Sequence, residues 1–275
     1  MEERVVSRRG ILIVVFVSFL IVGSTFVRDY FYFSPFVVFC DVGQGDATYI
    51  RLRKGFDVLV DVGPNKKVLS CLGKYMPFFD RTIEIVFVSH PQKDHFGGLE
   101  YVIDRYKIKM LFSNSIKTES SSYRSLINKI SKKNIILRYF ISGDHITFNG
   151  IKFTSFWPAE NYKTIYSDPN EVSIVMLFAT SNKNILFTGD VDKKTLDVLS
   201  NKVQKINILK VPHHGSKNSL SRKFYYKTRP DISIINVGAN NSYGLPSQDV
   251  LNMLKEIKSE IRRTDKEGSI KINFK

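Results

Sequence analysis

The most constraining feature of this chain is the run Ser-His-Pro-Gln-Lys-Asp-His-Phe-Gly-Gly at residues 89–98. It follows the apolar segment 83–88, so we expect it on the loop that leaves the carboxyl end of a β-strand, where open α/β sheets place their ligand sites. His90, Asp94 and His95 lie close together in this run, and zinc, manganese and iron prefer imidazole and carboxylate ligands. The run therefore predicts a metal site at the edge of a sheet.

Polar side chains also follow other strand-like runs or lie between glycines. The residues concerned are Asp46, Asp61, Asp190, His213 and His214. Aspartate beside glycine is ordinary turn chemistry, so each segment alone indicates little. Their order along the chain, with the His-rich run among them, favours one shared site.

Strand-like and helix-like runs alternate after residue 35. Strands are expected at 36–40, 47–52, 57–61, 83–89, 109–112, 135–140, 151–156, 173–179, 184–188, 206–211 and 232–237. Helices are expected at 67–75, 99–106, 122–132, 193–199 and 247–258. Asn149-Gly150 has the chemistry of a hairpin turn. Many strands in two groups, with helices between them, predict one domain over residues 36–275 in which two sheets pack face to face.

The first 27 residues combine a basic region with an apolar run. Arg4, Arg8 and Arg9 precede the apolar segment 11–22, which small residues follow. This pattern is typical of a secretory signal peptide, and the run also approaches the length of a membrane anchor. We therefore expect residues 1–27 to be a signal peptide or a membrane anchor. Residues 28–275 would then lie outside the membrane, on a single-pass protein of the cell membrane or as a secreted or periplasmic domain.

Charge and cysteine content add two further expectations. The 275 residues carry a formal charge of +15, which attracts polyanions such as nucleic acid or an anionic membrane, unless it reflects only a lysine-rich composition. Cys40 and Cys71 are the two cysteines. Cys40 lies in an apolar run, and the pair has no metal-binding spacing, so we expect two unpaired thiols; a disulfide is the alternative for an exported domain.

The order of the motifs resembles the metallo-β-lactamase superfamily, and more narrowly the metallo-β-lactamase-like domain of the ComEC family of DNA-uptake competence proteins. The matching segments are 41–47, 61–63, 90–98, 188–190, 209–216 and 237–244. The resemblance implies an α/β fold of four layers. This fold is an αββα sandwich with metal at one edge, here preceded by one N-terminal hydrophobic helix.

The resemblance also implies a ligand set. The superfamily's metal loop reads His-x-His-x-Asp-His, in which the first two His serve one metal and the Asp-His serves a second. Gln92 fills the second His position with a poorly ligating amide, and no His lies between residues 156 and 184, so the first site keeps only His90 and Asp190. The expected ligands of the second site are Asp94, His95, Asp190 and one of His213 and His214. We therefore expect one divalent ion, zinc or manganese.

Other residues receive roles from their positions. Asp94 is expected to orient a water molecule, and Lys210 to balance charge in a phosphorane-like transition state. Ser216 and Lys217 are expected to hold a phosphate. Asp46, Asp61 and Gln92 are expected to orient the metal ligands. Leu245 stands where relatives tend to have His, so a substrate contact made there in relatives would be absent.

Three functions remain open. The leading interpretation is a metal-dependent phosphodiesterase that cleaves single- or double-stranded DNA outside the membrane, either beside a membrane DNA-uptake channel or in nutrient scavenging. A second is a metal hydrolase that acts on a cell-envelope phosphodiester or a small ester. The third is a non-catalytic DNA-binding module, in which Tyr225, Tyr226 and Tyr243 stack on bases unless they are core or turn residues.

Overall fold

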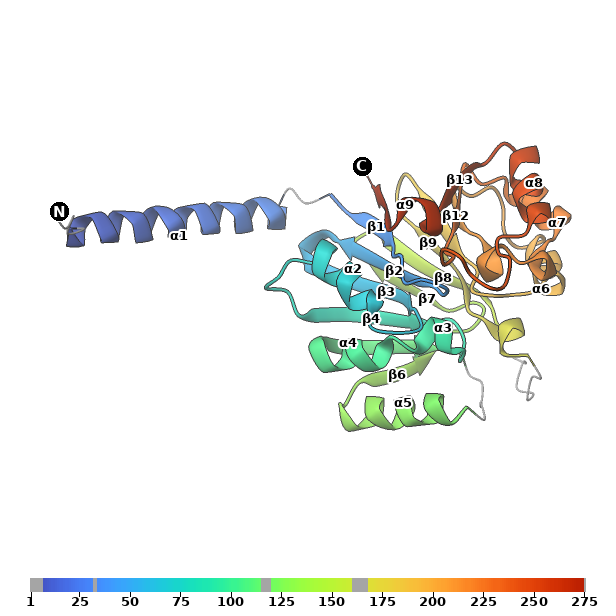
Figure 1. Ribbon diagram of the computed structural model, residues 1–275, viewed down its shortest axis with the longest axis horizontal. Helices are drawn as coiled ribbons and strands as arrows, with labels where there is room; N and C mark the ends of the chain where they lie inside the picture. The colour runs from blue at the N-terminus through green and yellow to red at the C-terminus, as the bar shows by residue number, and fades with distance from the viewer. Residues whose placement is uncertain (1–6, 32–33, 115–119, 160–167, 275) are drawn as a thin grey trace.

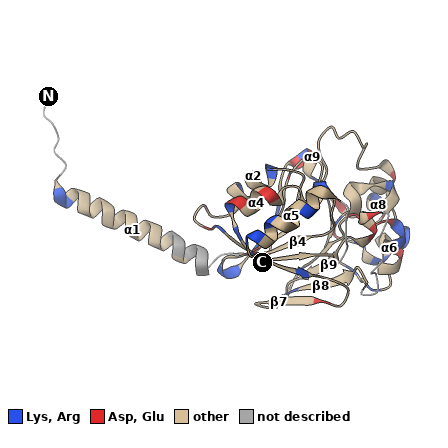
Figure 2. Ribbon diagram, turned by 90° about the horizontal axis from the view of Figure 1, so that it is seen from below, with Lys and Arg blue, Asp and Glu red and all other residues tan. Residues whose placement is uncertain are grey.

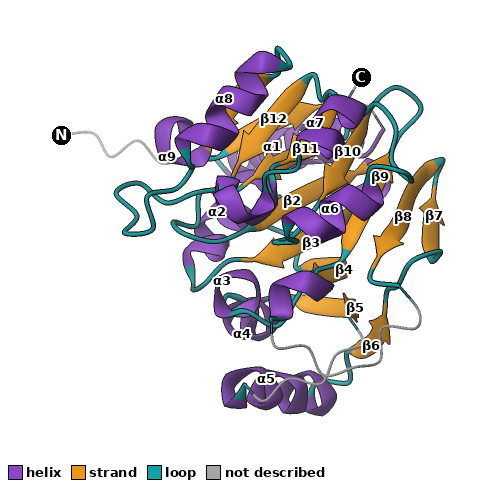
Figure 3. Ribbon diagram, turned by 90° about the vertical axis from the view of Figure 1, so that its right-hand side faces the viewer, coloured by secondary structure: helices purple, strands orange, loops and turns teal. Residues whose placement is uncertain are grey.

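The computed structural model describes residues 7–31, 34–114, 120–159 and 168–274. Two seven-stranded sheets pack face to face, and helices cover both outer faces (Figure 1, Figure 3). The predicted four-layer α/β sandwich, preceded by an N-terminal helix, is therefore confirmed. Residues 1–6, with the predicted basic Arg4, lie outside the described part of the chain.

The first sheet contains the early strands and the last strand of the chain. Its strands are β1 (Phe36–Phe39), β2 (Ala47–Leu52), β3 (Phe56–Val62), β4 (Thr82–Val88), β5 (Lys107–Ser113), β6 (Ile136–Tyr139) and β14 (Ile270–Asn273). Their order is β14-β1-β2-β3-β4-β5-β6. The strands from β3 to β6 are parallel, whereas β14, β1, β2 and β3 pair antiparallel.

The second sheet repeats this plan. Its strands are β7 (His145–Phe148), β8 (Ile151–Trp157), β9 (Val175–Ala179), β10 (Asn184–Phe187), β11 (Ile208–Lys210), β12 (Ile232–Ile235) and β13 (Glu260–Arg263). Their order is β13-β12-β11-β10-β9-β8-β7, with parallel pairing from β10 to β13. The predicted hairpin turn joins β7 to β8, because Asn149 and Gly150 both have the positive φ that a tight hairpin turn requires.

Most helices cover the sheets by burying one face each. The helices are α1 (Arg8–Phe31), α2 (Lys67–Tyr75), α3 (Lys93–Phe96), α4 (Leu99–Arg105), α5 (Ser121–Lys132), α6 (Lys193–Leu199), α7 (Arg222–Thr228), α8 (Gln248–Glu256) and α9 (Thr264–Glu267). The 3-10 turns are η1 (Arg53–Gly55), η2 (Pro169–Val172), η3 (Pro212–Gly215) and η4 (Lys217–Ser219). α2, α4 and α5 share an apolar core with the first sheet, and α6, α7 and α8 share one with the second.

A third apolar core lies between the sheets and holds them together. Along β2, Ile50 and Leu52 belong to this inner core, whereas Tyr49 belongs to the core under the helices. This is the two-residue alternation expected of a strand that is buried on both faces. Phe87, Phe153 and other aromatic rings fill the inner core, with 5.5 Å between the centroids of this pair. The packing fixes how the ends of the parallel strands in one sheet lie against those in the other.

The helix α1 is the predicted N-terminal apolar helix. It projects away from the sandwich (Figure 1), and its apolar side chains between Ile11 and Val22 are exposed. In the described part of the chain, none of the helices combines the length and the apolar character that crossing a bilayer requires.

The expectation of two unpaired thiols is wrong. A disulfide joins Cys40, directly after β1, to Cys71 in α2, and it ties a strand of the first sheet to the helix that covers it. The two residues are 31 positions apart in sequence, and only the packing of α2 on the sheet brings their Cα atoms to 5.9 Å. Their spacing carried no sign of this pairing.

Replacing both cysteines with alanine is expected to lower the free energy of unfolding by about 3–4 kcal/mol, because the bond closes a long loop in the unfolded chain. Urea denaturation followed by circular dichroism measures this change. A thiol reductant should destabilise the wild-type chain to a similar extent and leave the double variant unchanged. Equal stability of the oxidised wild type and the variant would contradict the bond.

Candidate metal centre

The His-rich run forms the loop between β4 and α3. Gln92 is the N-cap residue directly before α3, and its backbone carbonyl accepts a hydrogen bond from the amide of His95 at 2.9 Å. One turn of helix thus carries both Asp94 and His95. Gly98 allows this turn to pack on β3, because a Cβ atom there would lie 2.1 Å from the carbonyl oxygen of Val62.

The structure brings four of the predicted ligands together. Ligating atoms of Asp94, His95, Asp190 and His214 all lie within 4.8 Å of one another. Nε2 of His95 is 3.3 Å from Oδ2 of Asp190, and Nε2 of His214 is 3.5 Å from the same oxygen. Nε2 of His214 is also 3.4 Å from Oδ2 of Asp94. Asp94 and His95 follow a strand of the first sheet, and Asp190 and His214 follow strands of the second, so the cluster spans both sheets.

His95 is oriented by Asp61 and Ser89. Oδ2 of Asp61 lies 2.9 Å from Nδ1 of His95 and accepts a hydrogen bond from the Ser89 hydroxyl at 2.8 Å. Oδ1 of Asp61 accepts the Ser89 amide at 2.7 Å. With Nδ1 engaged, Nε2 of His95 lies next to Asp190, and this buried atom has no hydrogen-bond partner of good geometry among the described residues. In metal sites, hydrogen bonds to the ring nitrogen that does not bind the metal fix the orientation of the imidazole.

His214 joins the cluster, whereas His213 lies at its rim. Nδ1 of His214 is 2.8 Å from the backbone carbonyl of Asn236, which leaves Nε2 for the cluster. The side chain of His214 is buried, but that of His213 is 27% exposed and its Nε2 is 3.9 Å from Asp190. Both histidines have a positive φ, of 50° and 52°, a costly conformation that is frequent at functional sites.

Lys210 is buried beside the cluster. Its ammonium group donates to the carbonyl of Gly189 at 3.1 Å, contacts the carboxylate of Asp46 and lies 3.5 Å from Oδ1 of Asp190. Oδ1 of Asp46 is in turn 3.4 Å from Nδ1 of His214. Lys210 therefore balances the charge of carboxylates inside the protein, and its action on a transition state stays a prediction.

The buried charges shift one another's pKa values. Burial alone would raise the pKa of Asp190, but His95 and His214 outweigh it and hold this pKa well below its usual range. Burial would lower the pKa of His214, yet Asp190 and Asp46 raise it to about 10. Burial would also lower the pKa of His95, but Asp190 and Asp61 raise it well above its usual range. In the protein without a bound cation, protons on both imidazoles therefore balance the negative charge of the carboxylates.

His90 lies outside the cluster. It is fully buried, its Nδ1 is 3.0 Å from the Ser89 hydroxyl, and its Nε2 meets no hydrogen-bond partner in the described part of the chain. Burial, and then the positive charge of His95, lower the pKa of His90 to about 3, so this imidazole is neutral at pH 7. A second group of potential ligands among the described residues consists of Asp46, Asp61 and His95, and neither this group nor the cluster includes His90. The predicted weak first site thus has no assembled ligand set around His90, and Gln92 contributes backbone contacts to α3.

Ser216 and Lys217, the predicted phosphate-binding residues, follow the paired histidines. The Ser216 hydroxyl accepts the amide of Asn218 at 3.3 Å and so caps η4. Nζ of Lys217 pairs with Asp249 of α8 at 3.0 Å, although its side chain is largely exposed. Their role toward a phosphate stays a prediction.

The three tyrosines considered for base stacking divide into two groups. Tyr225 is fully buried against Phe224, so it belongs to the core and cannot stack on a base. Tyr226 and Tyr243 are exposed.

Contacts that the motifs did not indicate complete the centre. Ser89 links Asp61 to His95, and the hydroxyl of Ser173 accepts the amide of Asp190 at 3.1 Å. Only its place directly before His90 distinguished Ser89 in the sequence. Asn236 acts on His214 through a backbone carbonyl, which no side-chain motif can indicate.

The donor set fits a divalent transition metal. Two imidazoles and two carboxylates are typical ligands of zinc and manganese. Nε2 of His95 is a buried atom without a hydrogen-bond partner among the described residues, and it faces the cluster. The carboxylate of Asp94 is 30% exposed, so the centre is open to solvent on this side.

Relatives of this chain support the family resemblance. Recombination protein 2 of Haemophilus influenzae is 29% identical over 238 residues, which cover 85% of this chain. ComE operon protein 3 of Bacillus subtilis is 26% identical over 258 residues, which cover 86%. The matches span 28% and 32% of the length of these relatives. The predicted resemblance to competence proteins is thereby confirmed.

A solved structure and a family profile agree with the fold. The metallo-beta-lactamase fold protein YhfI from Bacillus subtilis superposes with a TM-score of 0.61 at 12% identity, over 88% of this chain and 100% of that chain. The profile of the Metallo-beta-lactamase superfamily matches residues 40–238, which is most of the chain. This protein therefore belongs to the metallo-β-lactamase superfamily.

Proposed function

We propose that this protein is a metal-dependent phosphodiesterase that cleaves DNA. The observation that carries the proposal is the cluster of Asp94, His95, Asp190 and His214 at the edge where the two sheets meet. A divalent cation held by these residues would activate water and polarise the bond under attack.

The surface charge and the relatives support DNA as the substrate. The chain carries a formal charge of +15, and Lys and Arg residues are distributed over several helices, α5 and α6 among them (Figure 2). A polyanion is attracted to such a surface, whereas a small neutral ester is not. The similarity to Recombination protein 2 and to ComE operon protein 3 favours DNA over other polyanions.

The side chains of the centre have different roles. Asp94 is the most exposed of the four clustered residues. Hydrogen bonding from His214 and the charge of His95 outweigh burial and lower the pKa of Asp94, so its carboxylate is ionised at neutral pH and accepts a hydrogen bond from the attacking water. Lys210 keeps a fixed positive charge beside Asp46 and Asp190. Asp61 holds His95 in place through Nδ1.

We also propose that the protein works outside the cytoplasm. The disulfide between Cys40 and Cys71 supports this location, because such bonds persist in oxidising compartments. Extracellular DNA is accessible there, beside a membrane channel that takes up one strand.

The purified full chain is expected to degrade DNA when manganese or zinc is supplied, and to stop when a chelator is added. Asp190→Asn should reduce the rate by about 100-fold or more, because it weakens the centre of the ligand cluster. Gel electrophoresis of single- and double-stranded DNA measures the rate. Asp192→Asn is the matched control, since asparagine also caps α6 and should leave cleavage unchanged.

Cleavage that survives Asp190→Asn or the chelator would contradict the proposal. DNA binding without cleavage, at any metal tested, would favour a non-catalytic binding module. Binding measured by fluorescence anisotropy should weaken steeply with salt, because counterions are released on association. Hydrolysis of a small ester that is faster than that of DNA and insensitive to salt would favour the second alternative.

One metal ion per chain is expected, because His90 lies outside the cluster of ligands. Metal analysis after loading with manganese or zinc and dialysis should return about one ion. His90→Ala should retain this ion, whereas His95→Ala should lose it, with the fold of both variants checked by circular dichroism. Two tightly held ions in the wild type would contradict the single site.

Metal affinity is expected to rise with pH. The pKa values of His95 and His214 are raised in the protein without metal, so both imidazoles carry a proton at pH 7 that a bound cation must displace. Between pH 6 and 8 the affinity should increase by about 10- to 100-fold per pH unit, as one or two protons are released. Calorimetry in buffers of different ionisation enthalpy counts these protons. A pH-independent affinity would show that the imidazoles are already neutral.

A further inference from the structure

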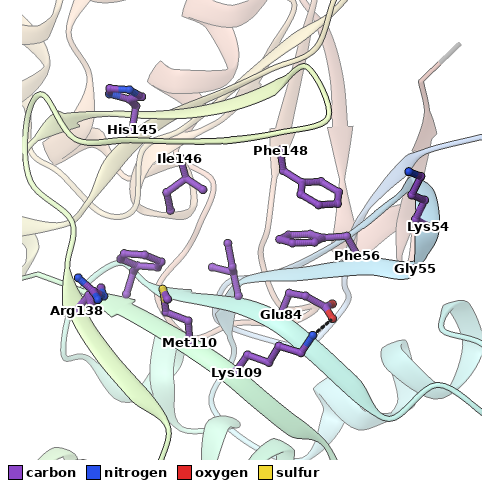
Figure 4. A pocket seen from close by; sticks show the side chains of 12 residues that line it. Lys54, Gly55, Phe56, Glu84, Lys109, Met110, Arg138, His145, Ile146 and Phe148 are labelled. Carbon is purple, nitrogen blue, oxygen red and sulfur yellow. Dashed lines mark ion pairs between the residues drawn. The ribbon is translucent and has the colours of Figure 1, made fainter.

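A cavity lies between the sheets, away from the metal centre. It has a volume of about 720 Å³, within the roughly 300–1,000 Å³ typical of small-molecule sites, and it opens beside the edge strands β6 and β7 (Figure 4). Ile85 lines it from within β4, whereas Ser89 of the metal centre follows the end of the same strand. The four residue steps from Ile85 to Ser89 correspond to about 13 Å of extended chain, which separates the two sites.

The walls of this cavity are apolar. They are formed by Phe56, Ile85, Met110, Phe112, Ile146 and Phe148. Four of these side chains belong to the inner core but are only partly buried, because the short strands β6 and β7 end the sheets there. Phe56 and Phe148 stack with 4.0 Å between their ring centroids and close one end (Figure 4). An apolar chain inserted here would contact both sheets and complete the core.

The rim of the cavity is cationic. Lys54 and Arg138 lie at opposite ends of the opening (Figure 4), and among the described residues neither forms an ion pair. Glu84 is the one carboxylate of the lining. Its Oε1 pairs with Lys109 at 3.1 Å, and its Oε2 accepts the amide of Asp57 at 2.8 Å. The net charge that the rim presents to a ligand is therefore positive.

Lys54 is held at an unusual backbone position. Its φ of 62° lies in the left-handed region, where glycine would cost less. A charged side chain is thus present at the mouth of an apolar cavity in spite of the local backbone preference.

We propose that this cavity binds an anionic amphiphile with a single acyl chain. The acyl chain lies between the sheets, and the anionic headgroup pairs with Lys54 or with Arg138. The apolar walls and the unpaired cationic rim argue for this chemistry over a neutral apolar molecule, which would gain nothing from the rim. The site is independent of the metal centre and of the proposed DNA cleavage.

Binding of myristate to the full chain tests the proposal, with uncharged 1-tetradecanol as the comparison and displacement of a fluorescent fatty acid as the readout. Ile146→Trp, which fills the cavity, should abolish displacement by myristate. One of Lys54→Glu and Arg138→Glu should weaken it by about tenfold, and thereby identify the end that holds the headgroup. Lys202→Glu makes the same charge change at an exposed lysine outside the cavity and should have no effect.

Three results would overturn the proposal: equal affinity for tetradecanol and myristate, binding unaffected by Ile146→Trp, or binding unaffected by both rim variants. The exposed apolar side chains of α1 also attract amphiphiles, but binding there would not respond to these variants. Mass spectrometry of lipid extracted from the purified full chain separates the two sources of the ligand. A phospholipid that is present with the wild type and missing from Ile146→Trp would assign a lipid of the bilayer surface. A free fatty acid that is lost in the same way would assign the free molecule.

Discussion

Burial of negative charge where the two sheets meet is the constraint on which the centre depends. Asp46, Asp61 and Asp190 are each at most 3% exposed, and a buried carboxylate without a partner is strongly destabilising. The imidazoles of His95 and His214 and the ammonium group of Lys210 offset this cost. His95 comes from the turn after β4, whereas Lys210 and His214 come from the end of β11 and the turn that follows it. Folding the edge of the sandwich and balancing its charge are therefore one process.

Hydrogen bonds between the loops of the centre hold them in place. The amide of Asp46 donates to the carbonyl of Asp94 at 3.1 Å, and the amide of Gly63 donates to the carbonyl of Asp46 at 2.7 Å. The side-chain oxygen of Gln44 accepts the amide of Gly238 at 3.2 Å. The loop between β1 and β2 is thus bonded to the turn that carries Asp94 and His95, to the end of β3 and to a loop of the second sheet. The centre is held in place before any ligand binds, which is what a catalytic site requires.

Local patterns predicted most of this arrangement. Apolar runs located most strands and several helices, and the motifs identified the four clustered residues, because polar groups at the carboxyl ends of neighbouring strands share one edge. Features set by tertiary packing were not predictable. The choice of His214 over His213 depends on the Asn236 carbonyl, the burial of Lys210 on Asp46, and the disulfide on the packing of α2. The helix α7 was missed because its aromatic residues are poor helix formers that only the core stabilises.

The position of Lys210 gives a physical reason for the single metal ion proposed above. Asp190 directs Oδ2 toward His95 and His214, while its Oδ1 lies 3.5 Å from the ammonium group of Lys210. A second cation near Oδ1 would be repelled by this buried positive charge. His90, the first imidazole of the sequence motif, also lacks a companion histidine, because Gln92 occupies that position. Lys210 thus replaces a second metal ion in one respect: it neutralises the charge of Asp190, and as a side chain it cannot exchange with solvent. Charge balance at the centre would then require one exchangeable cation, and its loss would be compensated by protons on His95 and His214.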